Sequence, residues 1–216
     1  MKADGFVPAL AYNFLTPLYD PVVALTTRES TFKAELVRQV ALGPGHHALD
    51  LACGTGTLTL MLKNSAPEAS VKGIDGDPRI LELARQKASI NYRDVQFDEG
   101  MSYELPYQNE SFDRVVSSLF FHHLTRVDKL KTLHEIRRVL KPQGQFHIAD
   151  WGKSSNILTA IASYSIRMLD GFETTGDNFG GLLPDLIRES GFEQVLELRS
   201  FDTIFGTIRL YRSITR

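Results

Sequence analysis

Short apolar segments with the character of strands alternate with amphipathic segments with the character of helices along most of this 216-residue chain. Alternation of this kind produces right-handed crossovers between parallel strands, and the helices then cover both faces of the sheet. The alternation ends with two strand-like segments in direct succession. This succession indicates a hairpin through Asp202 and one antiparallel strand. We therefore expect an α/β fold with a doubly wound, seven-stranded, mostly parallel sheet and a C-terminal antiparallel strand pair. The strands are expected at 47–52, 71–74, 95–99, 112–124, 145–151, 193–201 and 203–214.

The length of the chain fits a single domain with a full hydrophobic core. Four parts can be distinguished within residues 1–216: an N-terminal helical arm at 1–42, a core at 43–151, a helical cover at 152–180, and a final helix and strand pair at 181–216. The arm and the cover have no place in the alternation, so they could close over a site. Apolar side chains of the cover are expected to pack against the sheet, and some could line an acceptor pocket: Tyr164, Met168, Leu169 and Phe172.

The composition excludes several classes of protein. The net charge of −2 gives no reason to expect nucleic acid or an acidic membrane as a partner. No run reaches the roughly 18 apolar residues that span a bilayer, and the N-terminal stretch lacks the apolar core of a signal peptide. Cys53 is the single cysteine, so no intrachain disulfide can form. We expect a soluble, cytoplasmic protein.

A turn with two glycines, Gly54 and Gly56, follows the first expected strand and precedes a helix. Glycine lets backbone N–H groups approach a ligand without a Cβ in the way, and the N-terminus of the helix attracts negative charge. Asp75 ends the second expected strand about 20 residues further on, where folds of this type bind the hydroxyls of a ribose. The turn and Asp75 together predict a nucleoside-containing cofactor at the carboxyl ends of the strands.

A dinucleotide is disfavoured as this cofactor. The dinucleotide fingerprint Gly-x-Gly-x-x-Gly requires a third glycine, and Thr59 occupies that position. The terminal strand pair also departs from the six-stranded parallel dinucleotide fold. A nicotinamide-dependent oxidoreductase is therefore a disfavoured alternative.

Four sequence blocks together resemble the class I S-adenosylmethionine-dependent methyltransferases, and within them the ubiquinone/menaquinone C-methyltransferase-like group (methyltransferase type 11/25). The blocks are "LDLACGTGTLT", "GIDGDP", "ELPYQNESFDRVVSSLFFHHL" and "EIRRVLKPQGQFHIADW". They stand in the order and at the spacing of that family, and the resemblance covers roughly residues 12–216. It implies S-adenosyl-L-methionine as the cofactor and methyl transfer to a small acceptor of aromatic or hydrophobic character.

The resemblance also implies which residues contact the cofactor. The glycine turn would hold the methionine and ribose parts, Asp75 would bind the ribose hydroxyls, and the residues after the third strand would flank the adenine. Relatives often carry an acid where this chain has Met101, so adenine recognition must use stacking and the backbone of Ser102, or else Asp98 or Glu99. The expected cofactor-binding residues are Tyr19, Asp50, Ala52, Gly54, Gly56, Asp75, Gly76, Met101, Ser102 and Ser117.

Methyl transfer to a carbon or a hydroxyl also requires a base. His122 and His123 end the fourth expected strand beside the expected methyl group, and Asp150 ends the fifth. Neighbours on a strand point to opposite sides, so one histidine is expected to face the substrate, and we favour His122. The alternatives are that His122 only orients a loop and that Asp150 makes a structural contact. Because the two histidines would diverge and no third ligand follows at a suitable spacing, we predict no metal site.

Two further functions stay open. Methylation of RNA or protein is disfavoured by the net charge and by the segment "SSLFFHHL", which stands where such enzymes have an Asn/Asp-Pro-Pro-Tyr-type segment. A protein that binds the cofactor without transferring methyl is compatible with the same glycine turn. The accepting atom stays open between carbon, oxygen, nitrogen and sulfur, and the C-terminal strands could supply a surface for a homodimer.

Overall fold

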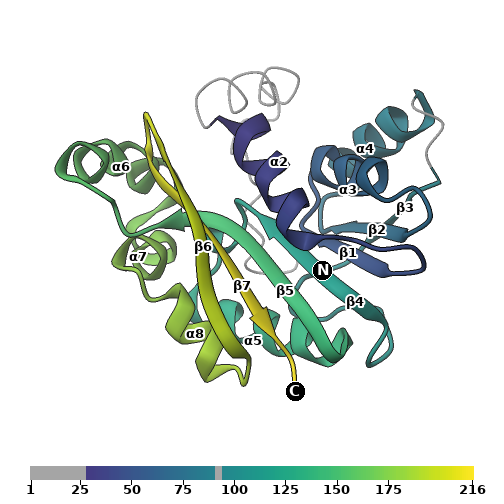
Figure 1. Ribbon diagram of the computed structural model, residues 1–216. Helices are drawn as coiled ribbons and strands as arrows, with labels where there is room; N and C mark the ends of the chain where they lie inside the picture. Colours follow the sequence, from purple (N-terminus) through teal and green to yellow (C-terminus); the bar gives the residue numbers. More distant parts are fainter. Residues whose placement is uncertain (1–27, 91–93) are drawn as a thin grey trace, which may run out of the picture.

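A seven-stranded sheet forms the centre of the computed structural model, which describes residues 28–90 and 94–216 (Figure 1). The strands lie in the order β3-β2-β1-β4-β5-β7-β6, and β7 is antiparallel to both of its neighbours. This arrangement confirms the predicted doubly wound, mostly parallel sheet with an antiparallel C-terminal pair. The strands are β1 (His47–Leu51), β2 (Ser70–Asp75), β3 (Gln96–Glu99), β4 (Phe112–Ser118), β5 (Leu140–Gly152), β6 (Glu193–Thr203) and β7 (Gly206–Ile214).

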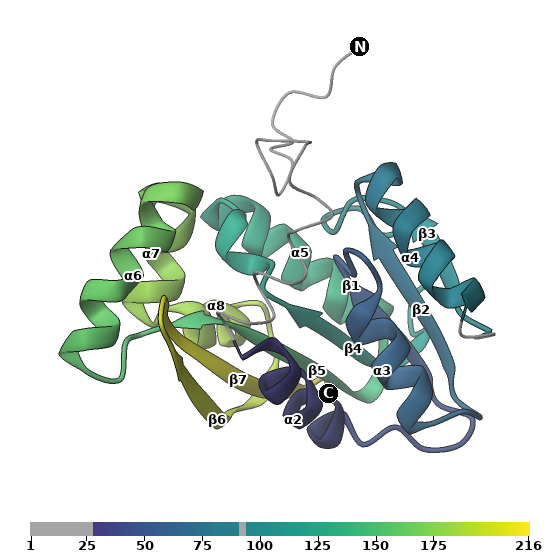
Figure 2. The same ribbon diagram turned by 90° about the horizontal axis from the view of Figure 1, so that it is seen from above.

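Helices cover both faces of this sheet (Figures 1 and 2). Because side chains alternate along a strand, Ala48 and Val116 pack with α2 and α3 on one face, while Leu49 and Val115 pack with α5 and α8 on the other. The two central strands are therefore apolar on both sides. The helices are α2 (Glu29–Val40), α3 (Thr57–Ser65), α4 (Pro78–Ile90), α5 (Arg126–Val139), α6 (Ile157–Asp170), α7 (Phe172–Gly180) and α8 (Leu183–Glu189).

The strand expected at 112–124 is shorter than predicted. β4 ends at Ser118, and residues Phe121–His123 form the 3-10 helix η1. The chain leaves the strand at Leu119, whose φ is 53°, and the carboxylate of Asp150 then accepts hydrogen bonds from the backbone N–H groups of Phe120 and Phe121. These bonds from β5 turn the chain out of the sheet, so the two histidines lie on a helical turn and not on a strand.

The C-terminal half departs from expectation in two further details. The hairpin turns at 204–205, and Asp202, where we expected the turn, pairs with Thr207 inside the β6–β7 ladder. The cover at 152–180 contains two helices, α6 and α7, because Gly171 lies between them with a φ of 92°. The predicted cofactor contact Tyr19 lies outside the described residues. Within 28–90 and 94–216, no helix is long and apolar enough to cross a membrane.

Candidate functional site

The glycine turn opens onto the carboxyl end of the sheet. Gly54 has a φ of 54°, and a Cβ placed on it would meet no other described atom within 4 Å. Gly56 has a φ of 77°, but a Cβ there would come within 2.9 Å of the ring of Phe97. The two glycines therefore serve different needs: Gly54 leaves bare backbone facing open space, whereas Gly56 permits the close packing of β3 and α4 behind the turn.

Asp75 is bonded to the turn from the end of β2. Its Oδ2 atom accepts a hydrogen bond from the backbone N–H of Gly54 at 2.9 Å, and its Oδ1 atom accepts one from Asp77 at 3.0 Å. Burial raises the pKa of Asp75, although these backbone bonds act in the opposite direction. The structure thus brings together the glycine turn and the carboxylate that the sequence predicts to bind a ribose, with the partly exposed Gly76 next to it.

Other predicted cofactor residues direct their side chains into the protein. Asp50 is 1% exposed and accepts a hydrogen bond from Thr59 Oγ1 at 2.6 Å, and burial raises its pKa to about 7. Ser117 is buried and donates to the carbonyl of Leu51 at 3.1 Å. Asp50 thus joins β1 to α3, and Ser117 joins β4 to the end of β1. Ala52 contributes to the same turn through its backbone, with a φ of 55°.

Polar groups near the end of β3 are engaged within the protein. Ser102 is buried, and its hydroxyl lies 2.9 Å from that of Thr132 on α5. Met101 is half-buried, and its carbonyl accepts a hydrogen bond from the N–H of Glu104. Asp98, an alternative contact for adenine, instead accepts a hydrogen bond from the hydroxyl of Tyr107. The hydroxyl of Ser102 and the carboxylate of Asp98 thus already have protein partners.

Asp150 occupies the end of β5 as a buried anion. Its carboxylate accepts hydrogen bonds from the backbone N–H groups of Phe121 and Trp151, both at 2.7 Å, and lies 2.6 Å from Nδ1 of His122. Burial alone would raise the pKa of Asp150, but His122 and the N–H of Trp151 outweigh it and hold the pKa below its ordinary value. A low pKa and full burial make Asp150 a poor base and a good partner for a histidine.

His122 and His123 lie side by side on η1, and Asp170 from the end of α6 faces both. Their ring centroids are 3.9 Å apart, so they do not diverge as a strand would require. Nε2 of His122 lies 3.6 Å from Oδ2 of Asp170, and Nδ1 of His123 lies 3.9 Å from Oδ1 of the same residue. Burial, together with the neighbouring His122, lowers the pKa of His123 to about 3. Burial raises the pKa of Asp170.

Two residues of this region were missed by sequence reasoning. Asp170 ends a helix of the cover, where an acid before glycine has no distinctive pattern. Lys129 lies in the first half of α5 and is fully buried; its Nζ donates to the carbonyl of Thr174 at 2.6 Å and lies 3.5 Å from Asp177. These contacts attach α7 to α5 beside the histidines. A lysine on the apolar stripe of a helix was the available signal for Lys129.

The cover does not pack against the sheet as fully as expected. Tyr164, Met168 and Phe172 are 55%, 75% and 49% exposed, and the side chain of Leu169 is not described. The ring of Phe179 stacks on Trp151 instead, and Arg167 lies over the rings of Tyr164 and Phe172. Phe179 of α7 and Ile166 of α6 pack against the core, while the outer face of α6 presents apolar side chains to its surroundings. The exposed apolar residues of α6 are Ile157, Leu158, Ile161, Tyr164 and Met168.

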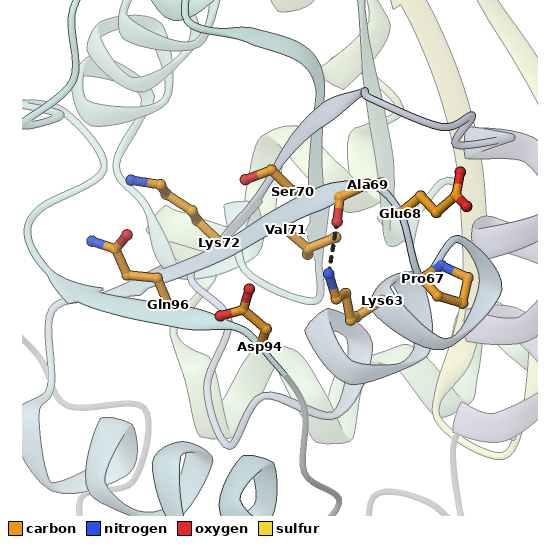
Figure 3. A pocket seen from close by; sticks show the side chains of 9 residues that line it. All are labelled: Lys63, Pro67, Glu68, Ala69, Ser70, Val71, Lys72, Asp94 and Gln96. Carbon is orange, nitrogen blue, oxygen red and sulfur yellow. Dashed lines mark hydrogen bonds between the residues drawn. The ribbon is translucent and has the colours of Figure 1, made fainter.

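A separate hollow of about 470 Å³ lies at the other end of the strands (Figure 3). It is formed by the end of α3, the start of β2 and the approach to β3, and Lys63 donates across it to the carbonyl of Ala69 at 2.9 Å. Its lining is polar, and none of the predicted site residues borders it. Ligands of such folds bind at the carboxyl ends of the strands, so this hollow is not the candidate site.

Comparison with known proteins decides the family. The chain is 34% identical over 175 residues to the demethylmenaquinone methyltransferase of Thermotoga maritima, covering 74% of this chain and 73% of that protein. The chain belongs to the ubiquinone/menaquinone C-methyltransferase-like group of the S-adenosylmethionine-dependent methyltransferases. The profile of a methyltransferase domain also matches residues 48–144, which contain the glycine turn, Asp75 and both histidines.

A second relative supports the family, and a solved structure supports the fold. The demethylmenaquinone methyltransferase of Deinococcus radiodurans is 34% identical over 140 residues, which are 63% of this chain and 57% of that protein, so the chain spans less than two thirds of its length. A solved S-adenosylmethionine-dependent methyltransferase from Methanosarcina mazei superposes with a TM-score of 0.64 at 21% identity, covering 83% of this chain and 98% of that one. This likeness places the chain in the class I methyltransferase fold.

Proposed function

We propose that this protein transfers a methyl group from S-adenosyl-L-methionine to a small aromatic acceptor of the reduced naphthoquinone class. The observation that carries the proposal is the Asp150–His122 pair at the carboxyl ends of β5 and β4. β4 is the neighbour of β1, whose carboxyl end carries the glycine turn. A cofactor site with a positioned base beside it is the arrangement that methylation of a hydroxylated ring requires. Relatives named for demethylmenaquinone and for 2-phytyl-1,4-naphthoquinone suggest the acceptor class.

The cofactor would lie against the glycine turn. Gly54 offers backbone without a Cβ, and Asp75 offers carboxylate oxygens that suit a pair of ribose hydroxyls. S-adenosyl-L-methionine supplies an activated methyl group with a good leaving group. The protein's own residues therefore need to align the acceptor, exclude water and remove a proton.

His122 is suited to take that proton. Because Asp150 engages Nδ1, the neutral imidazole directs the lone pair of Nε2 away from Asp150. Nε2 would accept the proton of an acceptor hydroxyl, which leaves an aryl oxide whose ring carbon would attack the methyl group as its bond to sulfur breaks. The hydrogen of that ring carbon would then move to the oxygen, which restores the aromatic ring and the hydroxyl. The Asp150 carboxylate stabilises the imidazolium, and Asp170 lies 3.6 Å from Nε2 with its side chain 22% exposed. Asp170 can therefore pass the proton towards solvent.

The exposed face of α6 fits an acceptor with an apolar tail. α6 ends at Asp170, beside the histidines, and its outer surface carries Ile161 at 66% exposure and Met168 at 75%. Apolar surface of this kind marks a site of contact with another apolar group. An acceptor ring near His122 could therefore extend a hydrocarbon tail along α6.

Methyl-labelled cofactor and a chemically reduced 2-polyprenyl-1,4-naphthoquinone test the proposal. We expect label to appear in the quinone, and we expect His122→Ala to lower the turnover by about 10²–10⁴-fold while S-adenosylhomocysteine still binds. His134→Ala, at an exposed position of α5, is the matched control and should keep full turnover. Absence of label with this acceptor, from protein that binds S-adenosylhomocysteine, would overturn the acceptor class.

A further inference from the structure

Three metal-ligating side chains converge beside the proposed acceptor site. The available atoms of His122, His123 and Asp170 all lie within 4.8 Å of one another. His122 Nε2 is 3.6 Å from Asp170 Oδ2, and His123 Nδ1 is 3.9 Å from Asp170 Oδ1. The convergence depends on η1, because consecutive side chains on such a turn are about 120° apart and do not point to opposite sides as on a strand; the two rings lie 3.9 Å apart.

These separations are close to those between ligands of one metal ion. Zinc lies about 2.0–2.2 Å from histidine nitrogen and carboxylate oxygen, so two ligands of a tetrahedral ion are about 3.4 Å apart. The two distances to Asp170 exceed this value by 0.2 and 0.5 Å, and the two histidine nitrogens, which lie within 4.8 Å of each other, would also approach. His123 and Asp170 are partly exposed, with side chains 27% and 22% accessible, and can make that movement without disturbing the core.

Asp150 orients the ring of His122 for metal binding. A histidine that binds a metal through one ring nitrogen commonly donates the N–H of the other to a carboxylate, which fixes the ring and raises its basicity. Asp150 provides this contact at 2.6 Å from Nδ1. The Nε2 lone pair and the carboxylate of Asp170 then face each other as two acceptors, which a cation between them would satisfy. The nearby ammonium of Lys129 is directed at Thr174 and Asp177 instead.

We propose that His122, His123 and Asp170 bind a divalent transition-metal ion, and that the bound ion inhibits methyl transfer. Two imidazoles and one carboxylate favour zinc, cobalt or iron over magnesium or calcium, which prefer oxygen ligands. The ion occupies Nε2 of His122, so that atom can no longer accept a proton from the acceptor. The metal site stands on the geometry alone, whereas its inhibitory effect rests on the proposed function.

Cobalt(II) is the probe for the metal site. The full chain, freed of metal by a chelator and dialysis, is titrated with cobalt chloride while the visible d–d absorption and the bound metal are measured. We expect one equivalent to bind, with the absorption of an ion of low coordination number, and excess zinc should displace it. Asp150→Asn should weaken cobalt binding by about 10–100-fold through the lost orienting contact.

Variants test which side chains bind the metal ion. Asp170→Asn keeps the size of the side chain and removes its charge, and it should abolish the cobalt absorption, as should His123→Ala. Asp185→Asn on α8 and His134→Ala on α5, both exposed, are the matched controls and should bind cobalt as the parent does. Failure of the parent to bind cobalt, or equal binding by Asp170→Asn, would overturn the metal site.

Zinc inhibition tests the second part of the proposal separately. Stoichiometric zinc should suppress labelled-methyl transfer, and a chelator should restore it. Cobalt binding without inhibition would overturn the inhibitory role and leave the metal site. Failure of S-adenosylhomocysteine to bind would instead count against the proposed function, and the cobalt absorption would still report on the cluster.

Discussion

The carboxylate of Asp150 lies 2.6 Å from Nδ1 of His122 and also receives the backbone N–H of Phe121, so one side chain fixes both the ring and the turn that carries it. The histidine is 3% exposed and the aspartate is fully buried. This contact joins the end of β5 to η1 and determines which ring nitrogen faces the proposed acceptor.

Asp150→Asn should therefore impair catalysis more than folding. An asparagine amide can donate to Nδ1, which would place the imidazole proton on Nε2 and remove its capacity as a base. We expect turnover to fall by about 10²–10⁴-fold and unfolding free energy to fall by about 1–3 kcal/mol. Steady-state assays and urea unfolding measure the two effects. Full turnover in a folded variant would exclude the positioning role of Asp150.

Asp50 should make stability depend on pH. Burial raises its pKa from 3.8 to about 7, so the protonated side chain is favoured in the folded state. Its contribution is fully present below pH 3.8 and is lost as the pH rises through about 7. Relative to Asp50→Asn, the parent should lose stability across this window, at about 1.4 kcal/mol for each pKa unit.

Urea unfolding of both proteins at several pH values within that window measures the difference. Groups common to the two proteins cancel in the comparison. A difference in unfolding free energy that stays constant with pH would contradict a raised pKa for Asp50.

Replacing each of the two glycines with alanine should distinguish an effect on cofactor binding from an effect on stability. Gly56→Ala would bring a Cβ to 2.9 Å from Phe97 and 3.1 Å from Ala84, and such overpacking costs about 1–3 kcal/mol. Gly54→Ala incurs the cost of a left-handed conformation, about 1–2 kcal/mol, but its Cβ enters the space proposed for the cofactor. We expect Gly54→Ala to lose more affinity for S-adenosylhomocysteine, and Gly56→Ala to show the lower unfolding midpoint. The reverse ranking would place the cofactor elsewhere.

A substitution on the exposed face of α6 should change the KM only for acceptors that have a tail. Ile161→Glu adds a charge at a position that is 66% exposed, so stability should change by less than about 0.5 kcal/mol. The KM for a polyprenyl acceptor should rise, and the KM for the same ring without a tail should stay constant. Ile90→Glu, at a 75% exposed position at the end of α4, is the control. Equal effects on both acceptors would show that α6 does not contact the tail.

The sheet and the glycine turn were predictable because their signals are local. Largely apolar runs around Leu49 and Val115 indicate strands that are buried on both faces, and two glycines after a strand indicate a turn that is open to a ligand. Asp75 could be joined to that turn from spacing alone, since parallel strands end at one edge of a sheet. In the structure, Asp75 lies beside the turn and accepts a hydrogen bond from the backbone N–H of Gly54.

The cluster around His122 was not predictable in the same way. An apolar run through "SSLFFHHL" favours a continuous strand. The strand stops because the backbone N–H groups of Phe120 and Phe121 donate hydrogen bonds to Asp150, which only the structure shows. The approach of Asp170 to the two histidines depends on how α6 and α7 pack beside η1, which no local sequence pattern predicts. The inference that the two histidines diverge was wrong for the same reason, since it assumed a strand.

Calorimetric titration with S-adenosylhomocysteine, with NADH as the control ligand, tests the central claim most directly. We predict that the parent protein binds S-adenosylhomocysteine and not NADH. Asp75→Ala should weaken the binding by about 10–100-fold, as expected for the loss of hydrogen bonds to a charged group, while Asp185→Ala should bind like the parent. A folded parent protein that does not bind S-adenosylhomocysteine, or that binds NADH in its place, would contradict the account.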